Sequence, residues 1–385
     1  MYKRQEKENL NKMKKELKIL FTEPFPYYYE VEGRVHKYLG NENFSYGLAS
    51  ISSYCKSKGF KKIKYIDPRF LKLSEKDYYN YLKKNDFDVV AMSCFTSNIN
   101  QVFITSKMIK KVLPNVIIVL GGIHVSILPE DSMRECQEAD IIVIGEGEIT
   151  FFEILKAIKK GNSFKKIKGI CYRERGKIIK NERREKIDNL DILPMPDYKL
   201  FPIKEYTSRI TQSKRFPTYS ITASRGCPFN CSFCNEKFPG KKVRYKSVGK
   251  VISEIKYLKE EYGAKGITFY DSTFTVNKSW VKSFCKSLIK NNLNISWNCF
   301  TRTDSVEKNL LKLMKSAGCW SISFGIESGN QKSLDFINKN ITIEKNTSIV
   351  KLALKMGFYV GTNYILCLPG EKKRMFLIRL NMPKD

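Results

Sequence analysis

Three cysteines lie close together near the middle of the chain, at Cys227, Cys231 and Cys234. They follow the alternating run 218–223, which is typical of a strand, so one loop would present all three thiols. Thiolates are soft ligands that select iron–sulfur clusters, zinc or cuprous copper. A structural zinc would need a fourth ligand at comparable spacing, and none is visible nearby. Three cysteines on a four-iron cluster would leave one iron open to a substrate.

The C-x3-C-x2-C spacing, with the aromatic Phe233 directly before the last cysteine, resembles the radical SAM superfamily. The resemblance implies a four-iron four-sulfur cluster (4Fe-4S) whose free iron binds S-adenosylmethionine through its amino and carboxylate groups. One electron passed to S-adenosylmethionine then releases methionine and a 5'-deoxyadenosyl radical. Buried structural cysteines, or a zinc site completed from elsewhere in the chain, remain alternatives at this point.

Composition limits the class of protein. The 385 residues, 42% of them hydrophobic, are enough for two or three domains with cores. The sequence contains no run of 18 apolar residues and no signal peptide, so we expect a cytoplasmic protein without a membrane span. Eleven irregularly spaced cysteines argue against a disulfide framework. The net charge of +30 comes from Lys and Arg scattered along every predicted helix, without an RNA-binding motif, so we expect no nucleic-acid partner.

The first half of the chain alternates between strand-length apolar runs and helix-like periods. The predicted strands are 18–22, 62–67, 88–94, 116–121 and 140–145, and the predicted helices are 46–58, 74–84, 98–113, 129–138 and 148–160. This alternation predicts an α/β domain, a doubly wound, Rossmann-like parallel sheet with helices on both faces. Its ligand would lie at the carboxyl ends of the strands.

The ends of these strands resemble the cobalamin-binding domain that precedes the radical SAM domain in one branch of the superfamily. A Gly-Gly-x-His turn lies at 121–124 and a Gly-Glu-Gly-Glu turn at 145–148. The resemblance implies cobalamin, with candidate contacts at Ser93, Thr96, Gly121, Gly122, His124, Ser126, Gly145, Glu146, Gly147 and Glu148. A nucleotide-binding fold, or a degenerate domain without a cofactor, remains an alternative.

The cobalt-ligating motif Asp-x-His-x-x-Gly of many cobalamin proteins is missing after the first predicted strand. That segment, residues 23–29, is interpreted as a loop, and His36 misses the spacing of the motif. We therefore expect cobalamin to bind without a protein imidazole.

The second half predicts a partial (β/α) barrel. A hairpin at 169–180 and a proline-punctuated linker at 191–197 precede about five βα units, with strands at 218–223, 266–270, 295–300, 321–326 and 359–366. The barrel that the resemblance implies has six strands, so the chain apparently lacks the last one. The predicted divisions are a basic N-terminal extension 1–16, the cobalamin-binding-like domain 17–161, a hairpin and linker 162–216, the partial barrel 217–371 and a short basic tail 372–385.

Chemistry in a barrel of parallel strands lies at the carboxyl ends of the strands. The resemblance matches Phe233, Asp271, Arg302, Glu327, Ser328 and Gly361 to positions that contact S-adenosylmethionine. We expect Glu327 to have a partner because it ends an apolar strand, and Asp304 to cap the helix that follows it. Cys367 stands where a glycine is common in relatives. No residue type identifies a catalytic group.

These patterns predict a cobalamin-dependent radical SAM enzyme. The reaction that the resemblance implies is methyl transfer to an unactivated carbon or phosphorus of a small-molecule or natural-product-like substrate, with flavodoxin or ferredoxin as electron donor. Within the same class, an oxidative ring closure or rearrangement is an alternative. Another is an RNA methylthiotransferase, whose second cluster needs three N-terminal cysteines where this chain offers Cys55, Cys94 and Cys136. The last is a truncated cofactor-binding protein without turnover.

Overall fold

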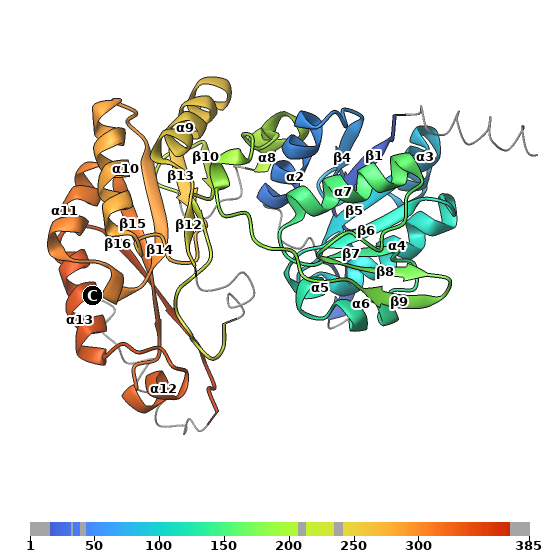
Figure 1. Ribbon diagram of the computed structural model, residues 1–385. Helices are drawn as coiled ribbons and strands as arrows, with labels where there is room; N and C mark the ends of the chain where they lie inside the picture. The colour runs from blue at the N-terminus through green and yellow to red at the C-terminus, as the bar shows by residue number, and fades with distance from the viewer. Residues whose placement is uncertain (1–15, 32–33, 39–43, 207–212, 235–241, 370–385) are drawn as a thin grey trace, which may run out of the picture. The chain divides into compact units, whose positions relative to one another are not determined.

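The computed structural model describes residues 16–31, 34–38, 44–206, 213–234 and 242–369. The chain forms two compact units, one of residues up to Ile187 together with Leu193–Ile203, and one of Asp188–Ile192 together with the chain from Lys204 onward (Figure 1). The unit boundary lies near the short helices η1 (Leu190–Ile192), η2 (Tyr198–Leu200) and α8 (Ile203–Tyr206). In the described part of the chain, no helix is long and apolar enough to cross a membrane.

The first unit is built on a seven-stranded sheet with the order β4-β1-β5-β6-β7-β8-β9. The strands are β1 (Ile19–Thr22), β4 (Ile63–Ile66), β5 (Val89–Ser93), β6 (Ile117–Gly121), β7 (Ile141–Val143), β8 (Ile170–Glu174) and β9 (Lys177–Lys180). The first five are parallel, and β8 and β9 add an antiparallel hairpin. All five predicted parallel strands are confirmed. The hairpin extends this sheet, whereas we expected it in a separate connection.

Helices cover both faces of this sheet. They are α2 (Tyr46–Ser57), α3 (Glu75–Asn85), α4 (Ile99–Val112), α5 (Ile123–Ile127), α6 (Pro129–Glu135) and α7 (Gly147–Lys160), with α2 packed beside α7 and α3 beside α4 (Figure 1). The predicted helix 129–138 ends at Glu135, and the short α5 before it was not predicted. Pro129 occupies the first turn of α6, where its missing N–H is harmless, so the chain starts a new helix there.

A hairpin of β2 (Tyr27–Val31) and β3 (Arg34–Tyr38) also belongs to this unit. The prediction of a loop at 23–29 was therefore wrong for its second half, and His36 lies in β3. The run of three tyrosines at 27–29 was the available signal, because aromatic residues favour strands.

The second unit contains a five-stranded parallel sheet with the order β10-β13-β14-β15-β16. The strands are β10 (Thr218–Ile221), β13 (Gly266–Phe269), β14 (Ser296–Thr301), β15 (Cys319–Glu327) and β16 (Tyr359–Tyr364). Each strand pairs with the next along the chain, as in a partial (β/α) barrel. The five predicted strands are confirmed. The expectation about a sixth strand concerns residues 370–385, which lie outside the described residues.

Four long helices lie along one face of this sheet, α9 (Val248–Tyr262), α10 (Lys278–Lys290), α11 (Lys308–Ser316) and α13 (Ile343–Lys355) (Figure 1). The rings of Phe269 and Trp297 contact that of Phe284 on α10, with centroids 5.4 and 5.6 Å apart. Because side chains alternate along a strand, Thr268, Tyr270 and Asn298 point to the opposite face. That face is the inner face of the partial barrel.

Two smaller features frame the cysteine segment. The strands β11 (Ser224–Arg225) and β12 (Arg244–Tyr245) pair antiparallel on either side of it. A short helix, α12 (Gln331–Phe336), follows β15 and was not predicted from the sequence.

Candidate functional site

The three cysteines lie in the loop that follows β11. Cys231 is buried, while Cys227 and Cys234 are half-buried, and none of the three forms a disulfide. Among the described residues, no three or more His, Cys, Asp or Glu side chains are arranged to hold a single metal ion. The thiol ligands of a four-iron cluster bind different irons and need not meet at one point. Three thiols in one loop suit such a cluster with one iron left open.

Asp271 anchors the beginning of this loop. It follows β13 and is buried, and its two carboxylate oxygens accept hydrogen bonds from Ala223 N at 3.1 and 3.2 Å and from Ser224 Oγ at 2.5 Å. Burial raises the pKa of Asp271 to about 6, although these hydrogen bonds oppose the rise. The sequence placed Asp271 at the correct strand end but did not predict this anchoring role.

Arg302 lies beside the second cysteine. Its Nη1 donates to Cys231 Sγ over 3.6 Å, and its guanidinium carbon lies 3.7 Å from the centre of the Phe229 ring. The same buried guanidinium makes a two-pronged contact with Asp304, Nε to Oδ1 at 3.0 Å and Nη2 to Oδ2 at 2.7 Å. A cation therefore sits next to a predicted cluster ligand, held by a carboxylate and an aromatic face.

The expectation that Asp304 caps the following helix was wrong. Asp304 lies in the short helix η4 (Thr303–Ser305), and α11 begins only at Lys308, with Glu307 at its N-cap position. The fork of Arg302 holds both carboxylate oxygens of Asp304, which makes it an orienting partner for the guanidinium.

Glu327 has the partner that we expected. It is the last residue of β15, and its Oε1 accepts a hydrogen bond from Lys339 Nζ over 2.8 Å, with both side chains largely buried. Glu327 adopts a φ of +62°, which is uncommon for a residue other than glycine. A Cβ on Gly325 would lie 2.6 Å from Glu327 Oε1 and 3.0 Å from Lys339 Nζ, so this glycine leaves room for the ion pair. Lys339 was not identified from the sequence.

The remaining predicted S-adenosylmethionine contacts are dispersed around these strand ends. Ser328 is fully buried and its hydroxyl accepts from Asn330 N over 3.2 Å, while Phe233 is 45% exposed. A Cβ on Gly361 would lie 2.7 Å from Ser323 Oγ, so close packing within the sheet explains why this residue is a glycine. Cys367 has a φ of +59°, a conformation that favours glycine and explains why the cysteine is unusual there.

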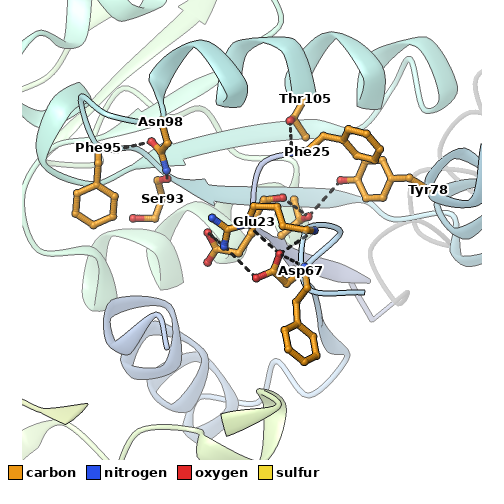
Figure 2. A network of polar contacts seen from close by, with 11 residues as sticks. Glu23, Phe25, Asp67, Tyr78, Ser93, Phe95, Asn98 and Thr105 are labelled. Atoms are coloured by element: carbon orange, nitrogen blue, oxygen red, sulfur yellow. Dashed lines mark hydrogen bonds and ion pairs between the residues drawn. The ribbon is translucent and has the colours of Figure 1, made fainter. Parts of the chain in front are cut away.

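In the first unit, the carboxyl ends of β5, β6 and β7 bring the predicted cobalamin contacts to one edge of the sheet. Thr96 Oγ1 lies 3.0 Å from His124 Nδ1, and Ser126 Oγ accepts from Gly145 N over 3.0 Å. Ser93 is the last residue of β5, and Asn98 Nδ2 donates to its carbonyl over 3.3 Å (Figure 2). These contacts connect three strand ends into one ordered surface.

Close packing within the first unit explains why glycines occupy two of the positions at this edge of the sheet. Gly122 has a φ of +105°, and a Cβ there would lie 2.6 Å from Cys94 O. A Cβ on Gly147 would lie 2.6 Å from Ile51 Cδ1 on α2, while a Cβ on Gly121 would make only an ordinary contact with Val143. The glycines thus allow close packing between loops and helices of the unit, whether or not a cofactor also approaches them.

The two predicted glutamates likewise have partners within the unit. Glu148 is buried and accepts from Ser50 Oγ over 2.6 Å, which connects α7 to α2. Glu146 Oε2 accepts from Ile187 N over 2.9 Å. Both carboxylates therefore stabilise the local fold.

Sequence reasoning missed a buried charged cluster at the ends of β1 and β4. Arg69 donates to both oxygens of Asp67, Nε to Oδ1 at 3.0 Å and Nη2 to Oδ2 at 2.9 Å, and Arg69 Nη2 lies 3.3 Å from Glu23 Oε2. Figure 2 shows Glu23 and Asp67 close together in this cluster. Burial raises the pKa of Glu23 to about 7. The strands β1 and β5 flank the point where the strand order reverses, which is where ligands bind in open α/β sheets.

Family models match both units. The radical SAM superfamily model matches residues 221–379, and the B12-binding domain model matches residues 36–155. An uncharacterized methyltransferase of Pyrococcus horikoshii is 36% identical over 360 residues, which cover 93% of this chain and 76% of the relative. The chain belongs to the radical SAM superfamily, in its cobalamin-binding branch.

Other relatives of this radical SAM protein are named for reactions other than simple methyl transfer. An anaerobic magnesium-protoporphyrin IX monomethyl ester cyclase of Rubrivivax gelatinosus is 28% identical over 344 residues, covering 88% of this chain and 61% of the cyclase. A putative methylthiotransferase of Methanocaldococcus jannaschii is 30% identical over 357 residues, covering 88% of this chain and 71% of the methylthiotransferase. The chain thus spans about three fifths of the length of the cyclase.

The solved structures confirm the fold. The radical S-adenosylmethionine methyltransferase TsrM of Kitasatospora setae superposes with a TM-score of 0.76 at 16% identity, over 93% of this chain and 69% of TsrM. The predicted fold class, a cobalamin-binding Rossmann-like domain followed by a radical SAM barrel, is confirmed. The predicted cofactors, a four-iron four-sulfur cluster, S-adenosylmethionine and cobalamin, are those of this branch.

The residues present fit these cofactors. The three thiols offer the cluster its protein ligands, and Arg302 places a positive charge beside one of them. At the edge of the first unit, Phe95 and Ile123 are 53% and 36% exposed, next in sequence to the bonded pair Thr96 and His124. Exposed apolar side chains beside polar groups suit a large flat ligand. Phe95 and Ile123 were not among the residues predicted from the sequence.

Proposed function

We propose that this radical SAM protein transfers a methyl group with the help of cobalamin. The observation that carries the proposal is the ordered cysteine loop at the strand ends of the second unit, in a chain that also has a cobalamin-binding domain and a relative named as a methyltransferase. When bound, the cluster supplies one electron to S-adenosylmethionine, and cobalamin supplies methyl-transfer chemistry. A small reducing protein such as flavodoxin or ferredoxin would deliver the electron. The eleven free cysteines suit a reducing compartment, which supports a cytoplasmic location.

We place the substrate against the inner face of the partial barrel. Thr268 Oγ1 is buried there and has no hydrogen-bond partner among the described residues, and a buried polar group of this kind calls for a ligand or water. Nearer the strand ends, Tyr270 stacks on Phe300 with ring centroids 5.9 Å apart and is 48% exposed. A buried hydroxyl on this face, with an aromatic pair nearer the strand ends, favours a small molecule that carries hydrogen-bonding groups.

The methylthiotransferase alternative is weaker, because the three N-terminal cysteines that would hold its second cluster lie at different elements in the described structure. Cys55 lies within α2, Cys94 follows β5, and Cys136 follows α6, and all three thiols are buried. Burial raises the pKa of each thiol, which disfavours the thiolate that a metal ligand requires. An oxidative ring closure needs no second cluster. Because one relative is named as a cyclase, ring closure is the second candidate reaction.

One labelling experiment separates these reactions. The reconstituted protein, S-adenosylmethionine with a trideuterated methyl group, cobalamin and a reductant are incubated anaerobically with small-molecule and RNA extracts, and the products are read by mass spectrometry. Methyl transfer predicts that a small molecule gains the CD3 group. Loss of hydrogen without label would indicate ring closure, and CD3S on RNA would indicate methylthiolation. Either of these results would overturn the proposal.

A further inference from the structure

A short turn after α12 makes direct contacts with the cysteine loop. Ser232, which follows the cluster cysteine Cys231, donates from its backbone N to Ile337 O over 2.8 Å. Asn338 Nδ2 donates to the hydroxyl oxygen of the same serine over 2.8 Å. Two successive residues of the turn thus hold one residue of the loop, through its backbone and its side chain.

The next residue of the turn extends these contacts to the cysteine itself. Lys339 O accepts a hydrogen bond from Arg302 Nη2 over 2.7 Å, and Arg302 Nη1 donates to Cys231 Sγ over 3.6 Å. Lys339 Nζ in turn pairs with Glu327. Residues Ile337–Lys339, which we call the clasp, therefore connect the end of β15 with the middle of the cysteine loop.

The backbone of the clasp explains its residue types. Asn338 has a φ of +52°, and Asn340 has a φ of +53°. Asparagine tolerates this left-handed conformation better than most residues, and glycine adopts it without strain. Asn338 therefore combines the required backbone with a side-chain donor. For Asn340, which is exposed, the described structure gives no side-chain hydrogen bond.

We propose that the clasp is a positioning element that holds Cys231 and Ser232 in the conformation that binds the cluster, before the cluster arrives. The proposal rests on the assignment of Cys231 as a cluster ligand and does not depend on which reaction follows. Without the clasp, the loop would keep the Asp271 anchor at its start, and the part around Cys231 would open more often. A ligand held in place beforehand binds its cluster without a further loss of conformational freedom.

The first test uses the cluster-free full chain and measures thiol alkylation with a maleimide, resolved by peptide mass spectrometry. Cys231 is only 8% exposed, so its alkylation reports local opening, while the half-buried Cys227 is an internal reference. Asn338→Gly keeps the left-handed backbone and removes the bond to Ser232. Since such a bond is worth about 0.5–1.5 kcal/mol, alkylation of Cys231 relative to Cys227 should rise about twofold to tenfold.

Asn340→Gly is the matched control, because it makes the same chemical change at the same backbone conformation two residues away. It should leave the Cys231-to-Cys227 ratio unchanged. Ser232→Ala removes the same bond from the loop side and should reproduce the Asn338→Gly effect, which also covers the case in which Asn338→Gly unfolds. The double variant should exceed neither single variant.

Equal Cys231 reactivity in the Asn338→Gly and Asn340→Gly proteins would overturn the proposal. So would an additive double variant, because it would mean that the two side chains act independently. A second readout follows the loaded protein, in which iron should be lost to a chelator several-fold faster from Asn338→Gly than from Asn340→Gly. Cluster loss at equal rates would show that the contact does not hold the ligand loop.

Discussion

The hydroxyl of Ser224 donates to the carboxylate of Asp271 over 2.5 Å, three residues before Cys227, the first of the predicted cluster ligands. This bond attaches the start of the cysteine loop to the end of β13. The sheet therefore positions the thiols through an acid that is itself deeply buried.

Ser224→Ala should destabilise the chain in a pH-dependent way. Above the pKa of Asp271, about 6, the buried carboxylate is ionised and loses a charge-assisted hydrogen bond, which costs about 1.5–3 kcal/mol of unfolding free energy. At pH 5 the acid is largely protonated and the loss should be smaller. Urea unfolding at pH 8 and pH 5 measures both values. The same loss at the two pH values would mean that the hydroxyl does not stabilise the carboxylate.

Arg302→Met should shift the midpoint potential of the reconstituted cluster to a more negative value. With a cluster bound at Cys231, the guanidinium beside its Sγ would stabilise the more negatively charged reduced state, and methionine removes both the charge and the donor. Arg302→Lys keeps a charge without the fork and should shift the potential less. Spectroelectrochemical titration checks both variants, and an unchanged potential in Arg302→Met would exclude a tuning role.

Gly325→Ala should separate the buried pair of Glu327 and Lys339. The added methyl group would lie 2.6 Å from Glu327 Oε1, and breaking a buried pair costs up to about 3–5 kcal/mol. Gly249→Ala in α9 is the control, since a Cβ there meets nothing within 4 Å and alanine favours a helix. Denaturant unfolding should show a large loss for the first variant and no loss for the second. Equal stabilities would contradict the space-making role of Gly325.

Glu23 should make the stability of the first unit depend on pH. Its pKa is raised to about 7 by burial, so between roughly pH 4.3 and 7 the folded chain binds more protons than the unfolded chain. Stability from this group is therefore present at low pH and declines as pH rises through this window, by up to about 3 kcal/mol. Glu23→Gln replaces the titratable carboxyl group with a neutral amide and should flatten the decline of stability with pH. A wild-type minus variant difference that does not fall between pH 4.5 and 7 would refute the assignment.

Much of the fold could be predicted from the sequence because local signals agree with the final structure. The apolar runs that became β1, β5 and β6 are buried on both faces of a parallel sheet, which leaves a continuous hydrophobic pattern. The cysteine spacing located the loop, and an acid at the end of the apolar strand β15 correctly indicated a partner for Glu327.

The partners themselves could not be predicted, because they are distant in sequence and common in type. Lys339 is one of 69 basic residues, and nothing local distinguishes it from a solvated lysine. Asp304 has the residue type of a helix cap, but the fork of Arg302 holds its carboxylate. Gly122 was expected to admit a cofactor, and the packed loop shows in addition that a Cβ there would collide with Cys94 O.

We propose that one chain combines a three-cysteine cluster with cobalamin to act on S-adenosylmethionine. The most direct measurement reconstitutes the chain anaerobically with iron, sulfide and cobalamin, removes unbound cofactor, and follows 5'-deoxyadenosine release after reduction. We expect the chain to retain both cluster and cobalamin, and we expect Cys231→Ala to abolish the cluster absorption and the release of 5'-deoxyadenosine while cobalamin stays bound. Undiminished 5'-deoxyadenosine release by Cys231→Ala, or a wild-type chain that retains no cobalamin, would contradict it.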